Sequence, residues 1–250
     1  MRLAPSGFTL VLIASLAACT AAPSPTSDPS ASPTGSSSAT PESSVTSIYY
    51  PVAQGNTWVY SIDYGSGTTV TDTEVMTVVV PEGDGSRVTF DRTFHWEDDS
   101  QPDLKDTVDY VFAADGSLTV PFQSIPSAGG IVTVTSGTMV WPTSAEFEAG
   151  TAKTGRIEAS VENAGTTTKE VVDFAIVGSG TEAVTVPAGS YTARKLSQAL
   201  VISLPDLGVE GITVNAITWL VEDVGPVQTV VPDMSGTTIT QVLVSFTPGR

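Results

Sequence analysis

The chain has 250 residues, and its 27 acidic residues outnumber its 10 basic residues, so the formal net charge is −17 at pH 7. An acidic chain is repelled by nucleic acid and by anionic lipid headgroups, which argues against nucleic-acid binding and against membrane contact through a basic patch. Because the chain has one cysteine, it forms no internal disulfide, and its stability must come from its hydrophobic core.

The N-terminus has the layout of a secretory signal. Arg2 makes the start basic, and an apolar segment of about nine residues runs from Phe8 to Leu16, too short for a membrane-spanning helix. Leu16-Ala17-Ala18-Cys19 then resembles a bacterial lipobox. We therefore predict that residues 1–18 are a lipoprotein signal peptide and that Cys19 carries diacylglycerol, with palmitate among its acyl groups. Two acyl chains on one cysteine give stable membrane attachment.

Residues 19–47 form the predicted tether. After Cys19 they are almost wholly Ser, Thr, Pro and Ala, a composition that cannot bury enough apolar area to offset chain entropy. We expect a disordered linker, whose hydroxyls could alternatively be glycosylated. The expected location is the extracytoplasmic face of the cell membrane in a Gram-positive host. Because Thr20 rather than Asp follows the cysteine, a Gram-negative source would imply the outer membrane.

From Ile48 onward, apolar and polar residues alternate with the period of two that is typical of half-buried strands. In the first such run, Trp58, Tyr60 and Ile62 share one face. Turns rich in Gly, Asp and Asn separate the runs, and Gly178-Ser179-Gly180 is interpreted as another hairpin turn. The predicted strands lie near residues 57–63, 68–80, 87–96, 107–113, 117–121, 131–140, 154–162, 167–177, 182–186, 190–203, 211–222, 226–231 and 237–246.

No run has a helical period, and no crossover helix fits between the strands. We predict a β-rich extracytoplasmic domain over residues 48–250. Its fold class is all-β, with about a dozen strands in a strongly curved antiparallel sheet, either a half-barrel or a sandwich, and little or no helix outside the signal peptide. Trp141-Pro142 echoes Tyr50-Pro51, so two similar halves that meet near residue 145 are an alternative.

Three segments resemble those of a broad set of poorly characterised bacterial lipoproteins. Tyr50-Pro51, with Gly55, Trp58 and Tyr60, is similar to their aromatic-Pro-x-x-x-Gly-x-x-Trp-x-Tyr opening. The other matching segments are Val186-Pro187-Ala188-Gly189-Ser190-Tyr191, similar to V-P-A-G-x-[FY], and Val224-Gly225-Pro226-Val227 after Trp219, similar to their closing strand pair. Some of these proteins are TapB-like lipoproteins. The resemblance implies a curved antiparallel sheet of the LolA and LolB type and an envelope location, but no catalytic residue.

The sequence shows no set of catalytic residues. His95 falls on the polar face of its strand, and the acidic stretch from Glu97 to Asp109 lacks the spacing of a calcium loop, so we expect a solvated loop there. No cofactor and no metal site is predicted. Trp96 and Trp141, both near strand ends, are the candidate residues for ligand contact.

These observations predict a lipid-anchored cell-envelope protein, attached to the membrane through Cys19. We expect it to be non-enzymatic and to bind an apolar ligand, a lipid or a protein partner on its curved β surface. Two alternatives remain open. One is a surface hydrolase that acts on wall glycan through paired carboxylates. The other is a purely structural envelope protein.

Overall fold

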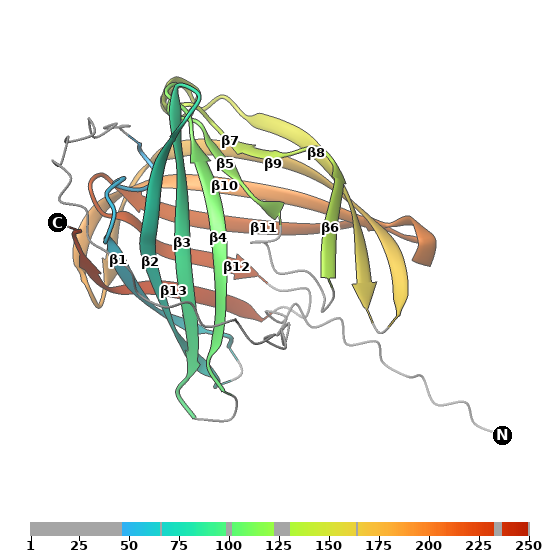
Figure 1. The fold of residues 1–250 in the computed structure, drawn as a ribbon, viewed down its shortest axis with the longest axis horizontal. Coiled ribbons are helices and arrows are strands. Elements are labelled where there is room, and N and C mark those ends of the chain that lie inside the picture. The colour runs from blue at the N-terminus through green and yellow to red at the C-terminus, as the bar shows by residue number, and fades with distance from the viewer. Residues whose placement is uncertain are drawn as a thin grey trace, which may run out of the picture.

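The fold is a single antiparallel sheet of 13 strands over the residues described by the computed structural model, which are 47–65, 67–98, 102–122, 131–163, 165–232 and 237–249 (Figure 1). A six-residue helix and a 3-10 turn are the helical elements within these ranges. The predicted all-β class with a strongly curved sheet is therefore confirmed. Cys19, the signal peptide and residues 19–46 of the linker lie outside the described residues.

The strands are β1 (Thr57–Asp63), β2 (Thr69–Glu82), β3 (Gly85–Trp96), β4 (Leu104–Phe112), β5 (Leu118–Val120), β6 (Ile131–Ser136), β7 (Met139–Trp141), β8 (Lys153–Asn163), β9 (Thr166–Val186), β10 (Gly189–Leu204), β11 (Val209–Val221), β12 (Gly225–Pro232) and β13 (Thr238–Thr247). Helix α1 (Ser144–Ala149) lies between β7 and β8, and the 3-10 turn η2 (Pro205–Leu207) lies between β10 and β11. No helix in the described part of the chain is long and apolar enough to span a membrane.

The two ends of the sheet are formed by neighbouring segments of the chain. The strand order is β6-β8-β9-β10-β11-β12-β13-β1-β2-β3-β4-β5-β7, so β6 and β7 are the outermost strands although only residues 137–138 separate them. Gly137 has a φ of 82°, and a Cβ there would lie 2.0 Å from the carbonyl oxygen of Arg156. Glycine therefore permits a sharp change of direction at this point. The predicted strand 131–140 is split there, and its two parts pair at opposite ends of the sheet.

Curvature of the sheet places two groups of strands face to face. In Figure 1, β2, β3 and β4 cross steeply in front of the long strands β10, β11 and β12. Alternate residues of each strand point inward and form a large core cluster and a smaller one around Ile62, Val70 and Trp96. Trp58, Tyr60 and Ile62 on β1 are all buried there, as the period of two predicted.

Strand β9 is continuous for 21 residues, where two strands and a turn were expected. The hairpin prediction at Gly178 is wrong, because this residue pairs with Leu196 and the strand only shifts register beside it. A Cβ at Gly178 would lie 2.5 Å from the backbone carbonyl oxygen of Phe147 on α1 and 2.7 Å from its ring. The glycine thus makes room for the helix instead of reversing the chain.

Helix α1 is short but closed at both ends. The side chain of Thr143 accepts a hydrogen bond from the backbone N–H of Glu146, and the Glu146 carboxylate accepts one from the backbone N–H of Thr143. This reciprocal pair is a capping box. Gly150 ends the helix with a φ of 63°. Phe147 is the buried residue of α1, so the helix covers part of the interior beside β9.

The residues before β1 carry two aromatic side chains into the interior. The ring of Tyr49 is fully buried, and its hydroxyl donates a 2.5 Å hydrogen bond to the carbonyl oxygen of Pro142. The ring of Tyr50 lies 5.5 Å from that of Trp58 and 5.3 Å from that of Phe90. Residues 47–56 are therefore part of the folded domain, and the ordered core begins with these two tyrosines.

Candidate ligand-binding pocket

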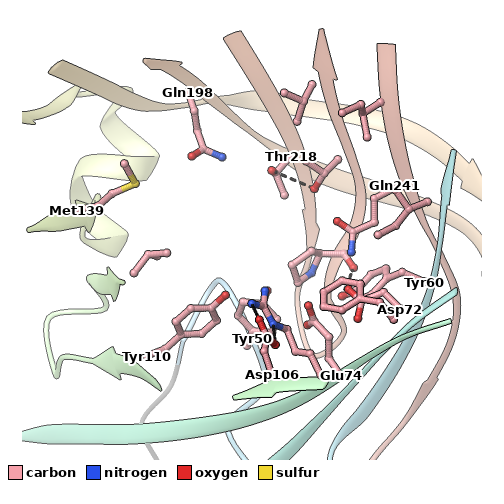
Figure 2. A pocket seen from close by; sticks show the side chains of 18 of the residues that line it. Tyr50, Tyr60, Asp72, Glu74, Asp106, Tyr110, Met139, Gln198, Thr218 and Gln241 are labelled. Carbon is pink, nitrogen blue, oxygen red and sulfur yellow. Dashed lines mark hydrogen bonds and ion pairs between the residues drawn. The ribbon is translucent and has the colours of Figure 1, made fainter. Parts of the chain in front are cut away.

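The curled sheet forms a partly open pocket of about 370 Å³ (Figure 2). Most of its lining comes from β1 to β5, β7 and β10 to β13, so its shape depends on the curvature described above. Much of its lining is apolar, including Phe94, Leu104, Val120, Met139, Leu200 and Ile239. The polar lining falls into two groups that lie on opposite sides of the pocket.

The first polar group is charged and lies on β2, β3 and β4. Glu74 is directly opposite Arg92 in the pairing of β2 with β3, and Arg92 is directly opposite Asp106 in the pairing of β3 with β4. The three side chains therefore form a cross-strand row on the inner face. The Arg92 guanidinium holds Asp106 with two hydrogen bonds, 2.8 Å from Nε to Oδ1 and 2.5 Å from Nη2 to Oδ2. Two of the guanidinium nitrogens of Arg92 are therefore occupied by hydrogen bonds to Asp106.

Asp72 is the next inward-facing residue of β2 beside Glu74. The two side chains are only 2% and 8% exposed, and Asp72 Oδ1 accepts no hydrogen bond. Burial, followed by the charge of Glu74, raises the pKa of the Asp72 carboxyl. Burial also raises the pKa of Glu74, although the charge of Arg92 offsets part of that effect. A side-chain hydrogen bond between the two carboxyls raises the pKa of Asp72 and lowers that of Glu74, so burial favours one proton held between them.

Tyrosine rings surround these carboxyls. Tyr60 is opposite Asp72 in the pairing of β1 with β2, and its hydroxyl donates to the carbonyl oxygen of Pro226 over 3.1 Å. Tyr50 and Tyr110 lie beside the charged row with ring centroids 6.1 Å apart. Burial raises the pKa of the Tyr50 and Tyr60 hydroxyls, so these phenols stay neutral. The carboxyls thus lie among aromatic surfaces with little access to water.

The second polar group is uncharged and lies on β10 to β13. Figure 2 shows Gln198 and Thr218 across the pocket from Glu74 and Asp106. The hydroxyls of Thr218 and Thr229 are 3.2 Å apart and hydrogen-bonded. No acidic residue among the described residues of these four strands lines the pocket. All the pocket carboxyls therefore come from one wall.

The structure separates the two tryptophans that the sequence singled out. Trp141 lines the pocket, and its indole Nε1 is buried without a hydrogen-bond partner. Trp96 is only 6% exposed, packs with Ile62 and Val70, and does not line the pocket. His95 lies on the outer face, where its Nδ1 is 2.9 Å from Asp103 Oδ1. Trp141 is thus the candidate that the fold brings to the pocket.

We expected the acidic stretch after Trp96 to be one solvated loop, and this prediction is wrong. Strand β4 already begins at Leu104, so Asp106 faces inward to Arg92 while Asp109 faces outward and accepts a hydrogen bond from Thr89. The regular alternation of a strand separates these carboxylates onto the two faces of the sheet. No group of three or more residues with metal-ligating side chains occurs within the described ranges.

Sequence reasoning did not single out Asp72, Glu74 or Arg92. A signal was nevertheless present, because each has the same parity as buried apolar residues of its own strand. Asp72 and Glu74 lie on the same face of β2 as Val70 and Met76. Arg92 likewise lies on the same face of β3 as Phe90 and Phe94. Charged residues on the inward parity of neighbouring strands indicate a polar patch inside the core.

Two solved bacterial structures share this fold. A candidate exported protein with a YmcC-like fold from Bacteroides fragilis is 14% identical and has a TM-score of 0.57, over 81% of this chain and 100% of the other. A candidate lipoprotein from Parabacteroides distasonis is 17% identical and has a TM-score of 0.62, over 81% of this chain and 99% of the other. No protein-family model and no curated protein matches the chain. At these identities the likeness extends to the fold alone, and the described domain has the fold of these two proteins.

Proposed function

We propose that the protein is a lipid-anchored envelope protein that binds a small amphipathic ligand inside its curved sheet. The observation that carries the proposal is the pocket itself, with an apolar lining on several strands and a buried carboxyl whose Oδ1 has no partner. A volume of about 370 Å³ is within the range of small-molecule sites. A filled core would have no such space, because protein interiors are normally close-packed.

Three independent observations support the envelope location. The lipobox at Cys19 and the polar linker after it predict a tether. The two proteins of the same fold are described as a candidate exported protein and a candidate lipoprotein. The opening and closing segments also resemble those of TapB-like lipoproteins, with the sheet type of the LolA and LolB carriers.

Replacement of the cysteine tests the tether. In the native host, the wild-type protein should incorporate an alkyne-labelled palmitate and sediment with membranes. Cys19→Ala should lose both properties, whereas Thr20→Ala, a change at the neighbouring position, should retain them. Membrane association that persists without label in Cys19→Ala would contradict the proposed anchor.

Ligand binding is tested by what the protein retains during purification. The whole chain with Cys19→Ala, which prevents its own acyl groups from entering the pocket, is isolated from the native host and analysed by native mass spectrometry. We expect a bound small molecule. Gln198→Trp, which fills the pocket, should remove it, and Asn215→Trp, on the exposed face of β11, should not. An empty pocket in the protein from the native host would contradict binding.

A hydrolase is the alternative with a specific observation in its favour, since carboxyls gather in one pocket and burial raises the pKa of two of them, Asp72 and Glu74. Glycan hydrolysis, however, needs two carboxyl groups that flank the scissile bond. Asp72 and Glu74 lie on β2 and Asp106 on β4, all in one wall, and the wall across from them offers amides and hydroxyls beside apolar side chains. We therefore expect no release of reducing sugar from cell-wall glycan. Release that Asp72→Asn or Glu74→Gln abolishes would establish the hydrolase instead.

A further inference from the structure

We propose that the ligand is a cationic amphiphile, with one ammonium group bound between Asp72 and Glu74 and its apolar part along the opposite wall. This inference rests on the proposed function and specifies the chemical class of the ligand. It comes from the balance of charge in the pocket, from the unpartnered Oδ1 of Asp72 and from the aromatic rings around it.

The charged row has more acid than base. Its one cation, Arg92, faces three carboxyls, and its Nε and Nη2 both bind Asp106. Asp72 and Glu74 are therefore left without a cationic partner of their own. A buried carboxylate is normally paired with a cation or coordinates a metal, because an unpaired charge is costly to bury. A ligand ammonium would complete this arrangement.

The surroundings of Asp72 favour an ammonium over a neutral hydroxylated ligand. The rings of Tyr60 and Tyr64 line the pocket beside it, and an aromatic face attracts a cation. Across the pocket, side chains such as Leu200, Val231 and Ile239 offer apolar contacts to the rest of the ligand. The same wall also carries amides and hydroxyls, Gln198, Thr218, Thr229 and Gln241, which could bind hydroxyl groups, so glucose is compared with the alkyl probes below.

In the absence of such a ligand, a proton takes its place on the carboxyl pair. Binding of an ammonium would then release that proton, so affinity for the cation should rise with pH. The titratable groups that face Asp72 or its row come from the opening segment and from β1 to β4, while the pocket-lining groups of β10 to β13 do not titrate. The titratable and charged groups are Tyr50, Tyr60, Tyr64, Glu74, Arg92, Asp106 and Tyr110.

Three probes with the same six-carbon chain isolate the effect of the head group. Hexylamine, hexan-1-ol and hexanoate are titrated calorimetrically into the whole chain with Cys19→Ala at pH 6, 7.5 and 8.5. An alkylammonium remains charged in this range, as a lysine side chain does. We expect hexylammonium to bind about tenfold more tightly than hexanol, hexanoate to bind least, and only the hexylammonium affinity to rise with pH.

Variants assign the selectivity to the pair. Asp72→Asn and, separately, Glu74→Gln should each reduce the preference for hexylammonium to within about threefold and leave hexanol affinity unchanged. Asp91→Asn, which removes the same charge from the exposed face of β3, should behave as the wild type. Circular dichroism identifies any variant that fails to fold, and the other carboxyl variant then provides the test.

The outcomes separate this inference from the function on which it rests. Equal affinities for hexylammonium and hexanol, unchanged by both carboxyl variants, would overturn the cation site and leave the pocket as a binding site. Tighter binding of glucose than of hexylamine would likewise replace the ammonium with a hydroxylated ligand. If no probe binds and the protein from the native host carries no ligand, the proposed function fails as well.

Discussion

The indole Nε1 of Trp58 donates a 2.6 Å hydrogen bond to the carbonyl oxygen of Val224, 166 residues later in the chain. Two residues further along β1, the Tyr60 hydroxyl makes the equivalent contact with Pro226. The opening and closing segments noted in the sequence are thus bonded to each other. Trp58→Phe should lower the free energy of unfolding by about 2 kcal/mol, because it leaves a partly buried carbonyl unpaired and a void in place of the fully buried indole. Urea denaturation followed by circular dichroism measures this change.

Trp219→Phe provides the matched comparison. The indole of Trp219 is partly exposed and bonds to the exposed side chain of Glu182 over 3.1 Å, so its loss should change the free energy of unfolding by less than about 1 kcal/mol. Equal effects of the two substitutions would show that the buried bond of Trp58 contributes no special stability.

The contact between Gly178 and Phe147 leads to a second prediction. Gly178→Ala forces a methyl group against both the backbone carbonyl oxygen and the ring of Phe147 and should destabilise the protein by about 2 kcal/mol in the same urea assay. In the background of Phe147→Ala, which itself destabilises the core, the part of this effect that comes from the ring should disappear, whereas the close contact with the backbone carbonyl oxygen remains. Ser179→Ala, at an exposed neighbouring position, should be close to neutral. A Gly178→Ala variant as stable as the wild type would refute the steric explanation.

The fold class was predictable because strand alternation is a local property of the sequence. Trp58, Tyr60 and Ile62 reveal a buried face whichever strand they pair with. Closure of the sheet was not predictable in this way, since it depends on residues 131–141 pairing with β8 at one end and with β5 at the other. Gly178 was misinterpreted for a related reason. A glycine that permits close packing is identical in sequence to one that turns the chain.

The pocket was harder to predict than the fold. Period-two analysis identifies inward positions but does not distinguish a filled interior from one that retains space. The charged row was missed because Asp106 was assigned to a loop, and the inward parity of Asp72 and Glu74 was not compared with that of Arg92 on the next strand. That comparison requires knowledge that β2, β3 and β4 are neighbours, which their order in the chain suggests.

The buried carboxyl pair predicts an unusual dependence of stability on pH. Burial and the charge of Glu74 raise the pKa of Asp72 to about 9, far above its value in an unfolded chain. A group whose pKa is higher in the folded state stabilises the fold fully below its unfolded pKa, and this stabilisation disappears as the pH rises through the folded pKa. The free energy of unfolding should therefore fall between pH 5 and about 9.

Urea denaturation at pH 5, 7 and 9 measures this fall, and Asp72→Asn should reduce it because the amide does not titrate. Carboxyls with a lowered pKa, such as Asp115 and Asp173, lose their stabilising effect in acid, below this window. Asp91→Asn serves as the control and should retain the wild-type pH profile. The same slope in Asp72→Asn and in the wild type would mean that Asp72 is ionised in the folded protein at neutral pH.

Replacing Trp141 with phenylalanine provides a comparison with Trp58→Phe, because the indole N–H of Trp141 has no hydrogen-bond partner. Its buried Nε1 makes no hydrogen bond within the protein, so Trp141→Phe removes an unsatisfied donor together with part of an aromatic ring. The lost packing and the relief of the unpaired donor oppose each other. The net change in the free energy of unfolding should be within about 1 kcal/mol of zero, in contrast to Trp58→Phe. If a ligand accepts this hydrogen bond, Trp141→Phe should also reduce the amount that co-purifies, as measured by native mass spectrometry. A loss of stability as large as that of Trp58→Phe would show that Trp141 acts mainly by packing against Tyr49, whose ring centroid lies 5.1 Å away.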